Sequence, residues 1–418
     1  MSVGKILFFS LSSRSTGEIS YLIGALNGKY RPGIELELIV HRSLSKVAGQ
    51  FPGQITYHDF LTKDRFEDIL NYLARISEHV DALVLIDVNS LCLEFNLTDK
   101  NREELIKFLE VASRDKKVAI IDYFCATVSD YQTYQSRKEL VERKVYEITR
   151  DLPGKPFEMY YFTKFLKMRA LSQILYLPSS VQILRPLPVT LKVTLQPESN
   201  ITYYKNTFWK VEQGKPDSKK FLITFSRFFS NRVIRPKFLE RLFIEVSRKI
   251  IQTADINEIV FIDPIGVVPE KFQLDDVRVT TYKWLERKAF LAVLAEAAFT
   301  AAFVPYATIG TISILNRIPF VSLYSSRFSS EIPWMRQALD SMVIPPFNGF
   351  GIWEDISFYD VLTENNLYFN TLIMADIGDD KSFITAIQSI RSQEHIKRIE
   401  SFLKMYPMDN LPFLVDAL

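Results

Sequence analysis

The stretch AFTAAFVPYATIGTISILNRIPFVSLYS, residues 298–325, carries the pattern on which the fold assignment rests. It predicts a short apolar strand at 301–304, a tight turn, a short helix and a second apolar strand at Phe320–Tyr324. The turn consists of small and hydroxylated residues, among them Ala307, Thr308, Gly310 and Thr311. Because a helix that begins at such a turn points N–H groups and the positive end of its dipole outward, the stretch predicts an anion site.

Strands and helices alternate through the rest of the chain. Apolar runs predict strands at 5–11, 34–40, Ala82–Ile86, 118–121, 221–225, Glu258–Ile262 and 277–280. Amphipathic spacing predicts helices at 18–30, 66–79, 102–113, 137–150, Pro236–Thr253 and 284–298, followed by a helical tail at 382–403. This order favours an α/β fold with two doubly wound, Rossmann-like domains that face each other across a cleft.

The length of 418 residues suits two domains of roughly 200 residues each. We expect an N-terminal acceptor domain (1–190), a linker (191–220), a C-terminal nucleotide or donor domain (221–385) and a C-terminal helical tail (386–418). The phrase RPLPV at 185–189 reads as an extended connection, and the polar residues 198–220 predict a linker or a hairpin.

Composition and missing motifs argue against several classes of function. The net charge is only +2, which gives no reason to propose a nucleic-acid-binding protein. The chain has no Walker loop, no GxGxxG after the first strand and no GxSxG elbow, which disfavours P-loop, dehydrogenase and α/β-hydrolase chemistry. The 32 Phe and 19 Tyr residues fit a large aromatic core, and an apolar acceptor groove is the alternative.

The cysteines and the first residues bear on cofactors and location. Cys92 and Cys125 have no metal-ligand spacing and are too few for a disulfide scaffold, so we predict neither a metal site nor a cofactor. The first residues predict a strand rather than a signal peptide, and no apolar run approaches the ~20 residues of a spanning helix. We therefore expect a cytoplasmic protein without a transmembrane segment.

Ligands of open parallel sheets bind beyond the carboxyl ends of the strands, and this rule selects candidate residues in the first half. The selected residues are Arg14, Ser15 and Glu18 as an acceptor-side loop, and His41, Asp87 and Asp122 as candidate catalytic bases. The alternatives are a structural histidine and aspartates that cap the following segments. For Glu18 the simpler alternative is a favourable contact with the dipole of the helix it begins.

The second half carries arginines and hydroxyls suited to a phosphate group. The predicted donor or phosphate site consists of Ser226, Arg227, Arg232, Thr308, Gly310 and Thr311. Arginine forks match phosphate oxygens, and Arg227 is nearest to a strand end. The alternative is a solvated, basic start of a helix.

Three segments carry a resemblance to a known family. They are KILFFSLSSRSTGEISYLIGAL at 5–26, the phrase RPLPV, and the series KFLITFSR, EIVFID and FVPYATIGTISILNRIPFVSL within 220–323. In order and spacing they are similar to the GT-B superfamily of glycosyltransferases, in particular to the branch with the enzyme that adds N-acetylglucosamine to the peptidoglycan lipid intermediate. The resemblance implies that a sugar is transferred from a nucleotide-activated donor to a small-molecule or lipid-linked acceptor without a bound metal.

The chain departs from the family pattern at three places. No acidic residue stands near Ile312, where the family binds the nucleotide ribose. Arg317 and Ile318 replace the family glycine and its neighbour before a proline. Arg14 and Glu18 stand near the place of the usual first-loop histidine.

These departures leave two other functions open. One is a non-catalytic GT-B-like protein that binds a protein partner. The other is a sugar-nucleotide epimerase with acidic residues from both halves, for which Asp87 and Asp263 are the suggestive pair.

Overall fold

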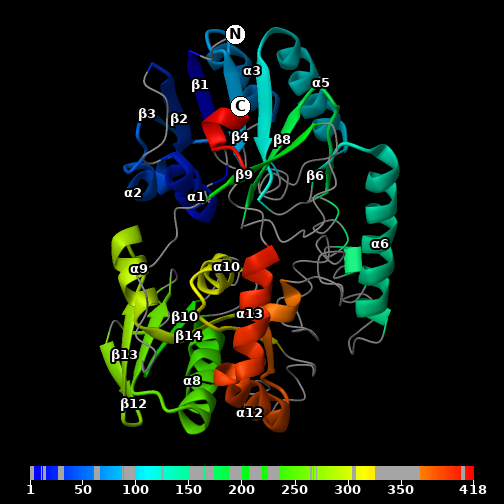
Figure 1. Cartoon of the computed structure of the whole chain (residues 1–418). Helices are drawn as coiled ribbons and strands as arrows, with labels where there is room; N and C mark the ends of the chain where they lie inside the picture. The colour runs from blue at the N-terminus through cyan, green and yellow to red at the C-terminus, as the bar shows by residue number, and fades with distance from the viewer. Residues whose placement is uncertain are drawn as a thin grey trace.

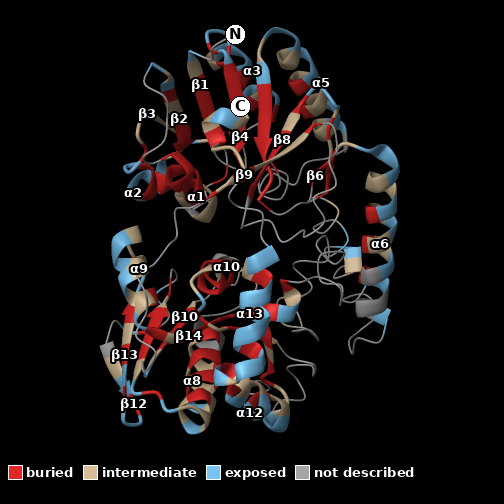
Figure 2. Ribbon diagram, viewed as in Figure 1, coloured by how far each residue is buried: buried red, intermediate tan, exposed pale blue. Residues whose placement is uncertain are grey.

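The computed structural model contains a largely parallel β-sheet in each half of the chain, with helices packed on the faces (Figure 1). It describes residues 4–10, 12, 16–26, 33–60, 66–86, 88, 99–123, 127–150, 160, 163–164, 167, 171, 174–187, 200–206, 219–224, 236–263, 266, 268–269, 271–303, 307–324, 368–405 and 410–418. The strands of both sheets are largely buried (Figure 2). The prediction of an α/β chain with two doubly wound sheets is confirmed.

The first sheet has seven parallel strands in the order β3-β2-β1-β4-β5-β8-β9. They are β1 (Lys5–Ser10), β2 (Glu35–His41), β3 (Gln54–His58), β4 (Ala82–Ile86), β5 (Lys117–Ile121), β8 (Gln182–Leu187) and β9 (Ile201–Lys205). The central strands are continuous apolar runs because helices cover both faces of the sheet.

The two faces of the first sheet belong to different hydrophobic clusters. Ile6 and Phe8 pack on one face with helix α1 (Thr16–Leu26). Leu7 and Phe9 pack on the other face with α3 (Phe66–Ile76) and α5 (Asp99–Asp115). Further described elements of this half are the 3-10 helix η1 (Arg42–Leu44), α2 (Ser45–Ala48), β6 (Thr127–Val128), α6 (Tyr131–Arg150) and β7 (Leu175–Tyr176).

The second sheet also has seven strands, in the order β12-β13-β11-β10-β14-β15-β16. They are β10 (Lys220–Thr224), β11 (Glu258–Ile262), β12 (Lys271–Leu274), β13 (Val277–Tyr282), β14 (Ala297–Ala302), β15 (Phe320–Tyr324) and β16 (Ile373–Asp376). Among the described strands of this sheet, β12 alone runs antiparallel to its neighbour. The described helices and 3-10 helices of this half are α8 (Pro236–Thr253), α9 (Arg287–Ala295), α10 (Thr308–Leu315), η4 (Phe369–Thr371), α12 (Asp380–Gln388), η5 (Ser389–Arg391), α13 (Gln393–Met405) and α14 (Leu414–Ala417).

Several predicted elements are confirmed with their boundaries, and others differ. The strands β4, β11 and β15 and the helix α8 begin and end where the sequence predicts. The strand expected at 301–304 lies at Ala297–Ala302 instead, because the chain pairs with β10 from Ala297 onward, which also ends the preceding helix early. The four edge strands of the two sheets, β3, β9, β12 and β16, were not predicted, and β8 was expected only as an extended connection. Strand β9 lies inside the expected linker 191–220 and has only one buried residue, so its pattern is weak.

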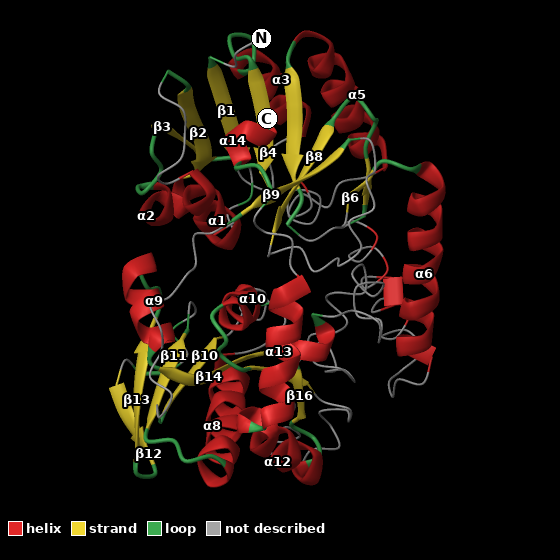
Figure 3. Cartoon of the chain, in the orientation of Figure 1, coloured by secondary structure: helices red, strands yellow, loops and turns green. Residues whose placement is uncertain are grey.

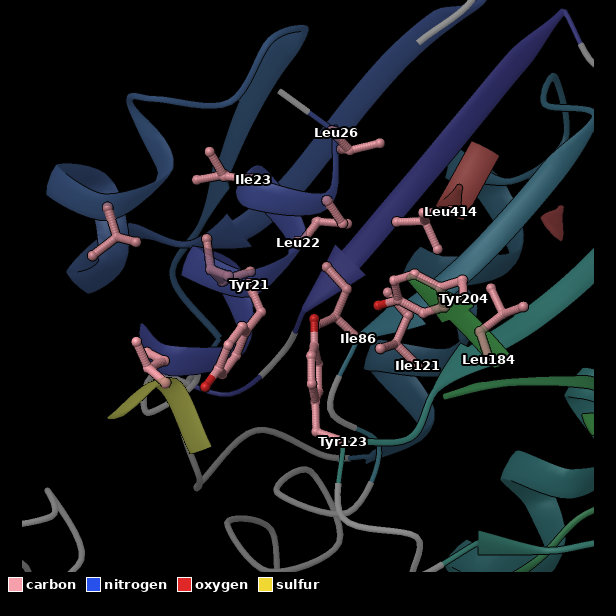
Figure 4. Packing of buried hydrophobic residues seen from close by; sticks show 14 of the residues in the cluster. Tyr21, Leu22, Ile23, Leu26, Ile86, Ile121, Tyr123, Leu184, Tyr204 and Leu414 are labelled. Atoms are coloured by element: carbon pink, nitrogen blue, oxygen red, sulfur yellow. The ribbon is translucent and has the colours of Figure 1, made fainter. Parts of the chain in front are cut away.

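The C-terminal tail returns to the first half of the chain. The Lys205 N–H of β9 donates to the Pro412 carbonyl at 3.0 Å, and the Lys205 ammonium lies 4.4 Å from the centre of the Phe413 ring. Leu414 of α14 is fully buried and lies beside Tyr204 and Leu184 (Figure 4). The tail therefore connects the helices that cover the second sheet with the core of the first.

The carboxyl ends of the parallel strands in both sheets point toward the middle of the molecule (Figure 3). This arrangement brings the two sets of strand ends, where ligands of doubly wound sheets bind, opposite each other. Among the described helices, none has the length and apolar character to cross a membrane.

Candidate functional site

His58 connects the carboxyl ends of three strands in the first sheet. It is the last residue of β3, and its Nε2 donates to the Ser10 carbonyl at the end of β1, 2.8 Å away. Its Nδ1 accepts a hydrogen bond from the Phe60 N–H at 3.3 Å. The ring of His41, at the end of the intervening β2, lies edge-on to the His58 ring at 5.4 Å. His58 thus fixes the carboxyl end of β1 at Ser10.

His41 caps the short 3-10 helix η1 that follows β2. Its Nδ1 accepts a hydrogen bond from the Ser43 N–H at 3.1 Å and lies 2.8 Å from the Ser43 hydroxyl. Beside it, the Arg42 guanidinium forms a forked contact with Asp59, with Nε–Oδ1 at 2.8 Å and Nη2–Oδ2 at 3.0 Å. The hydrogen bond from Arg42 holds the pKa of Asp59 below its ordinary value. This edge of the sheet is therefore an ordered polar surface.

Asp122, a candidate base at the end of β5, has a buried partner. Its Oδ2 lies 3.1 Å from Nε of Arg185, and both side chains are almost fully inaccessible. The same Oδ2 accepts a hydrogen bond from the Thr127 N–H at 3.3 Å, while Nη2 of Arg185 donates to the Thr127 carbonyl at 2.7 Å. A carboxylate held in this way connects the end of β5 to the start of β6, and it is poorly placed to take a proton from a ligand.

Tyr123, the next residue, fixes the first turn of helix α1. Its hydroxyl donates to the Glu18 carbonyl at 2.8 Å, and its ring stacks on the Tyr21 ring with centroids 5.8 Å apart (Figure 4). Glu18, an acceptor-side candidate, is half-buried. Its position therefore depends on a residue 105 positions later in the chain.

Helix α10 begins at the carboxyl end of β14 without a side-chain cap. Its N-cap residue is Ala307, which has no hydrogen-bonding side chain. The Gly310 N–H bonds to the Ala307 carbonyl at 2.7 Å. No described residue accepts a hydrogen bond from the N–H groups of Thr308 and Ile309, so this helix start can receive an anion.

Gly310 and Thr311 lie inside α10 and face the protein. A Cβ atom at Gly310 would lie 2.5 Å from the ring of Phe320 on β15, so this glycine permits the helix to approach the sheet. Thr311 is only 4% exposed, and its side chain shares a hydrogen bond with the buried Tyr368. Burial raises the pKa of Tyr368 far above the ordinary range. Both residues therefore have packing roles, which the turn-like sequence pattern did not distinguish from ligand binding.

Asp263, at the end of β11, is fully buried. Its Oδ2 accepts a hydrogen bond from the Val268 N–H at 3.2 Å, which connects the end of β11 to Val268. This use of the carboxylate gives no support to a catalytic pair of Asp263 with Asp87.

Several predicted site residues lie outside the described residues. They are Arg14, Ser15, Asp87, Ser226, Arg227 and Arg232, together with the side chain of Thr308. The approach of Arg227 to the start of α10 therefore stays a prediction. Within the described parts of the chain, no group of three His, Cys, Asp or Glu residues is arranged to hold a metal ion.

Comparisons with known proteins define the fold. No protein-family model matches the chain, and no curated protein matches it in sequence. Among solved structures, the glycotransferase of kitacinnamycin superposes with a TM-score of 0.54 at 13% identity, covering 99% of this chain and 97% of that one. A calicheamicin glycosyltransferase gives a TM-score of 0.51 at 12% identity, covering 97% and 94%.

A spinosyn rhamnosyltransferase gives a TM-score of 0.50 at 12% identity, covering 98% of this chain and 96% of that one. At such identities the likeness concerns the fold alone. The chain has the GT-B fold of two Rossmann-like domains, as the sequence resemblance implied.

Proposed function

We propose that this protein transfers a sugar from a nucleotide-activated donor to an acceptor, with the donor on the second sheet and the acceptor on the first. The observation that carries the proposal is the uncapped start of α10 at the carboxyl end of β14, on the side that faces the first sheet. The similarity of the whole chain to solved GT-B glycosyltransferases supports the proposal of sugar transfer.

The start of α10 suits the diphosphate of the donor. Two unused N–H groups and the positive end of the helix dipole would stabilise the negative charge that develops as the diphosphate leaves. Arg227 and Arg232, which follow β10, are the predicted cationic partners. Positive groups of this kind would neutralise the leaving diphosphate without a bound metal. We therefore predict metal-independent transfer.

The acceptor is proposed to meet the loops after the strands of the first sheet, near Arg14, Ser15 and Glu18. A hydroxyl that attacks a sugar needs a base within hydrogen-bond reach. Since Asp122 is engaged with Arg185, Asp87 is the better carboxylate candidate.

Thermal unfolding with nucleotides tests the proposal. The panel contains UDP, TDP and GDP and their common sugar conjugates. A nucleotide at 100 times its dissociation constant stabilises a protein by ~2.7 kcal/mol, which gives a measurable rise in Tm. The absence of any shift across the panel would refute the donor site.

The variant Thr308→Pro makes the test specific for α10. Proline fits the first helical position and removes one N–H, and the φ of −52° and ψ of 133° at Ala307 suit a residue before proline. We expect an unchanged Tm without ligand and nucleotide binding weaker by about 10-fold to 100-fold, since a charge-assisted hydrogen bond contributes ~1.5–3 kcal/mol. Arg317→Ala, at the other end of α10, is the control and should bind nucleotide as the wild type does.

The same measurement separates the rival functions. A non-catalytic GT-B-like protein would bind a protein partner and show no nucleotide-dependent shift. An epimerase would bind a nucleotide sugar and interconvert it with its epimer without an acceptor, which chromatography of the nucleotide sugar would reveal.

A further inference from the structure

The two ring nitrogens of His41 have different surroundings. The Ser43 N–H points at Nδ1, and a backbone N–H can only donate. A proton on Nδ1 would face this N–H, so the neutral ring carries its proton on Nε2. The Ser43 hydroxyl, 2.8 Å from Nδ1, can donate to the same lone pair.

The Nε2–H of His41 is left open. His41 is partly exposed, and no described residue forms a hydrogen bond with its Nε2. The charged neighbours are already paired, because Arg42 and Asp59 bind each other in a fork. His58 uses both of its own nitrogens, for Ser10 and Phe60. His41 therefore offers an uncommitted ring donor beside a charged pair and a second histidine whose contacts are already made.

The His41 ring is also fixed in position. Its Nδ1 caps η1, and its plane lies at 77° to the ring of His58, which is itself held between β1 and β3. A donor with a fixed direction at the carboxyl edge of a doubly wound sheet is well suited to orient a ligand.

We propose that His41 binds an oxygen atom of the acceptor by donating a hydrogen bond from Nε2. The inference rests on the proposed function, because it assigns the acceptor to the first sheet. The oxygen belongs either to a sugar-like hydroxyl or to a carboxylate or phosphate group. In this tautomer Nε2 has no lone pair, so His41 positions the acceptor and another residue takes its proton.

The tautomer can be measured without any activity. Long-range ¹H–¹⁵N correlation spectra of protein labelled with ¹⁵N at histidine show signals from only four side chains. The signal that disappears in His41→Gln belongs to His41. We expect a protonated Nε2 and an unprotonated Nδ1 at His41 at pH 8. A proton on Nδ1 would overturn the proposal.

Two probes distinguish the sources of the oxygen. Methyl β-glucoside supplies hydroxyl groups, and inorganic phosphate supplies anionic oxygens. We expect one of them to shift the Nε2 signal of His41 in a saturable way while the signal of the exposed His79 stays in place. If neither probe shifts the signal of His41, or if the signals of His41 and His79 shift equally, the proposal fails.

A matched pair of variants separates binding from capping. In His41→Asn, the amide oxygen can still accept from the Ser43 N–H, but the distal donor is lost. We expect His41→Asn to keep the wild-type Tm but to bind the active probe, methyl β-glucoside or phosphate, more weakly. His41→Ala should show both a lower Tm and weaker binding of that probe. If His41→Asn retains wild-type probe affinity, His41 is only a cap. Nucleotide-induced stabilisation is measured in parallel, so failure at His41 is distinguishable from failure of the donor site.

Discussion

Lys220, the first residue of β10, forms an ion pair with Glu258, the first residue of the neighbouring β11, with Nζ–Oε2 at 3.3 Å. The first sheet repeats this relationship between Lys5 of β1 and Glu35 of β2, at 3.5 Å. In both sheets the pair lies at the amino ends of parallel strands. The two halves therefore place matched charges at the edges opposite the candidate site and leave the carboxyl edges for ligands.

Replacement of Lys220 by Met should lower the stability of the second half. Lys220 also contacts Glu296 at 2.5 Å, so the substitution leaves two carboxylates near each other. Burial lowers the pKa of Lys220, but the two glutamates raise it more, and the net pKa lies above 10.5. We expect a loss of ~1 kcal/mol in urea unfolding at pH 7, and no difference from wild type once the pH rises above the folded pKa. An undiminished difference at high pH would contradict this explanation.

Replacement of Arg317 by Gly should stabilise the protein. Arg317 follows α10 with a φ of 58°, and its N–H bonds to the Ile314 carbonyl while the Ile318 N–H bonds to the Ser313 carbonyl. This is a Schellman motif, in which glycine is the usual residue at the left-handed position. We expect Arg317→Gly to gain ~0.5–1 kcal/mol in thermal or urea unfolding, and Arg317→Ala to gain nothing. Equal stability of the two variants would argue against backbone strain at this residue.

Replacement of Gly310 by Ala should destabilise the protein despite the better helix propensity of alanine. The added Cβ would lie 2.5 Å from the Phe320 ring, so the helix or the ring must shift. We expect a loss of ~1–3 kcal/mol, measured by urea unfolding. The double variant Gly310→Ala/Phe320→Leu should recover part of this loss, and a purely additive result would exclude the proposed contact.

Replacement of Arg185 by Met should be among the most damaging single changes. It would leave the buried carboxylate of Asp122 without its cation, which typically costs ~3–5 kcal/mol. The double variant Asp122→Asn/Arg185→Met should recover much of the stability, since no unpaired charge remains. If Asp122→Asn alone instead leaves stability unchanged and abolishes transfer, Asp122 is the base after all.

Stability should fall between neutral and mildly acidic pH because of His395. Burial, and secondarily the charge of Arg398, lower the pKa of His395 from 6.5 to about 4. As the pH falls below 6.5, His395 takes up a proton in the unfolded chain but stays neutral in the folded protein. The free energy of unfolding is therefore unaffected by His395 above pH 6.5 and decreases as the pH falls toward 4. We expect ~2 kcal/mol of this pH dependence to disappear in His395→Gln. The exposed His79→Gln is the control, and an unchanged slope in His395→Gln would contradict the assignment.

The sequence predicted which residues of the candidate site lie at the strand ends, but not which contacts their side chains make. The strand-end rule selected His41, Asp122 and the start of α10 because carboxyl ends of parallel strands meet at one edge. It did not reveal that Asp122 is paired or that the Nδ1 of His41 is occupied. Those features depend on Arg185, 63 residues from Asp122, and on the path of the chain at Ser43.

The sequence by itself determined the α/β class, the two doubly wound sheets and the boundaries of elements such as β4, β11, β15 and α8. It could do so because burial on both faces of a parallel sheet requires continuous apolar runs, and burial on one face of a helix requires a 3.6-residue period. Only the tertiary structure decided that Gly310 admits the Phe320 ring and that His58 reaches Ser10. Such contacts join residues distant in the chain. Local periodicity reports only which face of a helix or strand is buried, so it does not predict which distant side chain packs against that face.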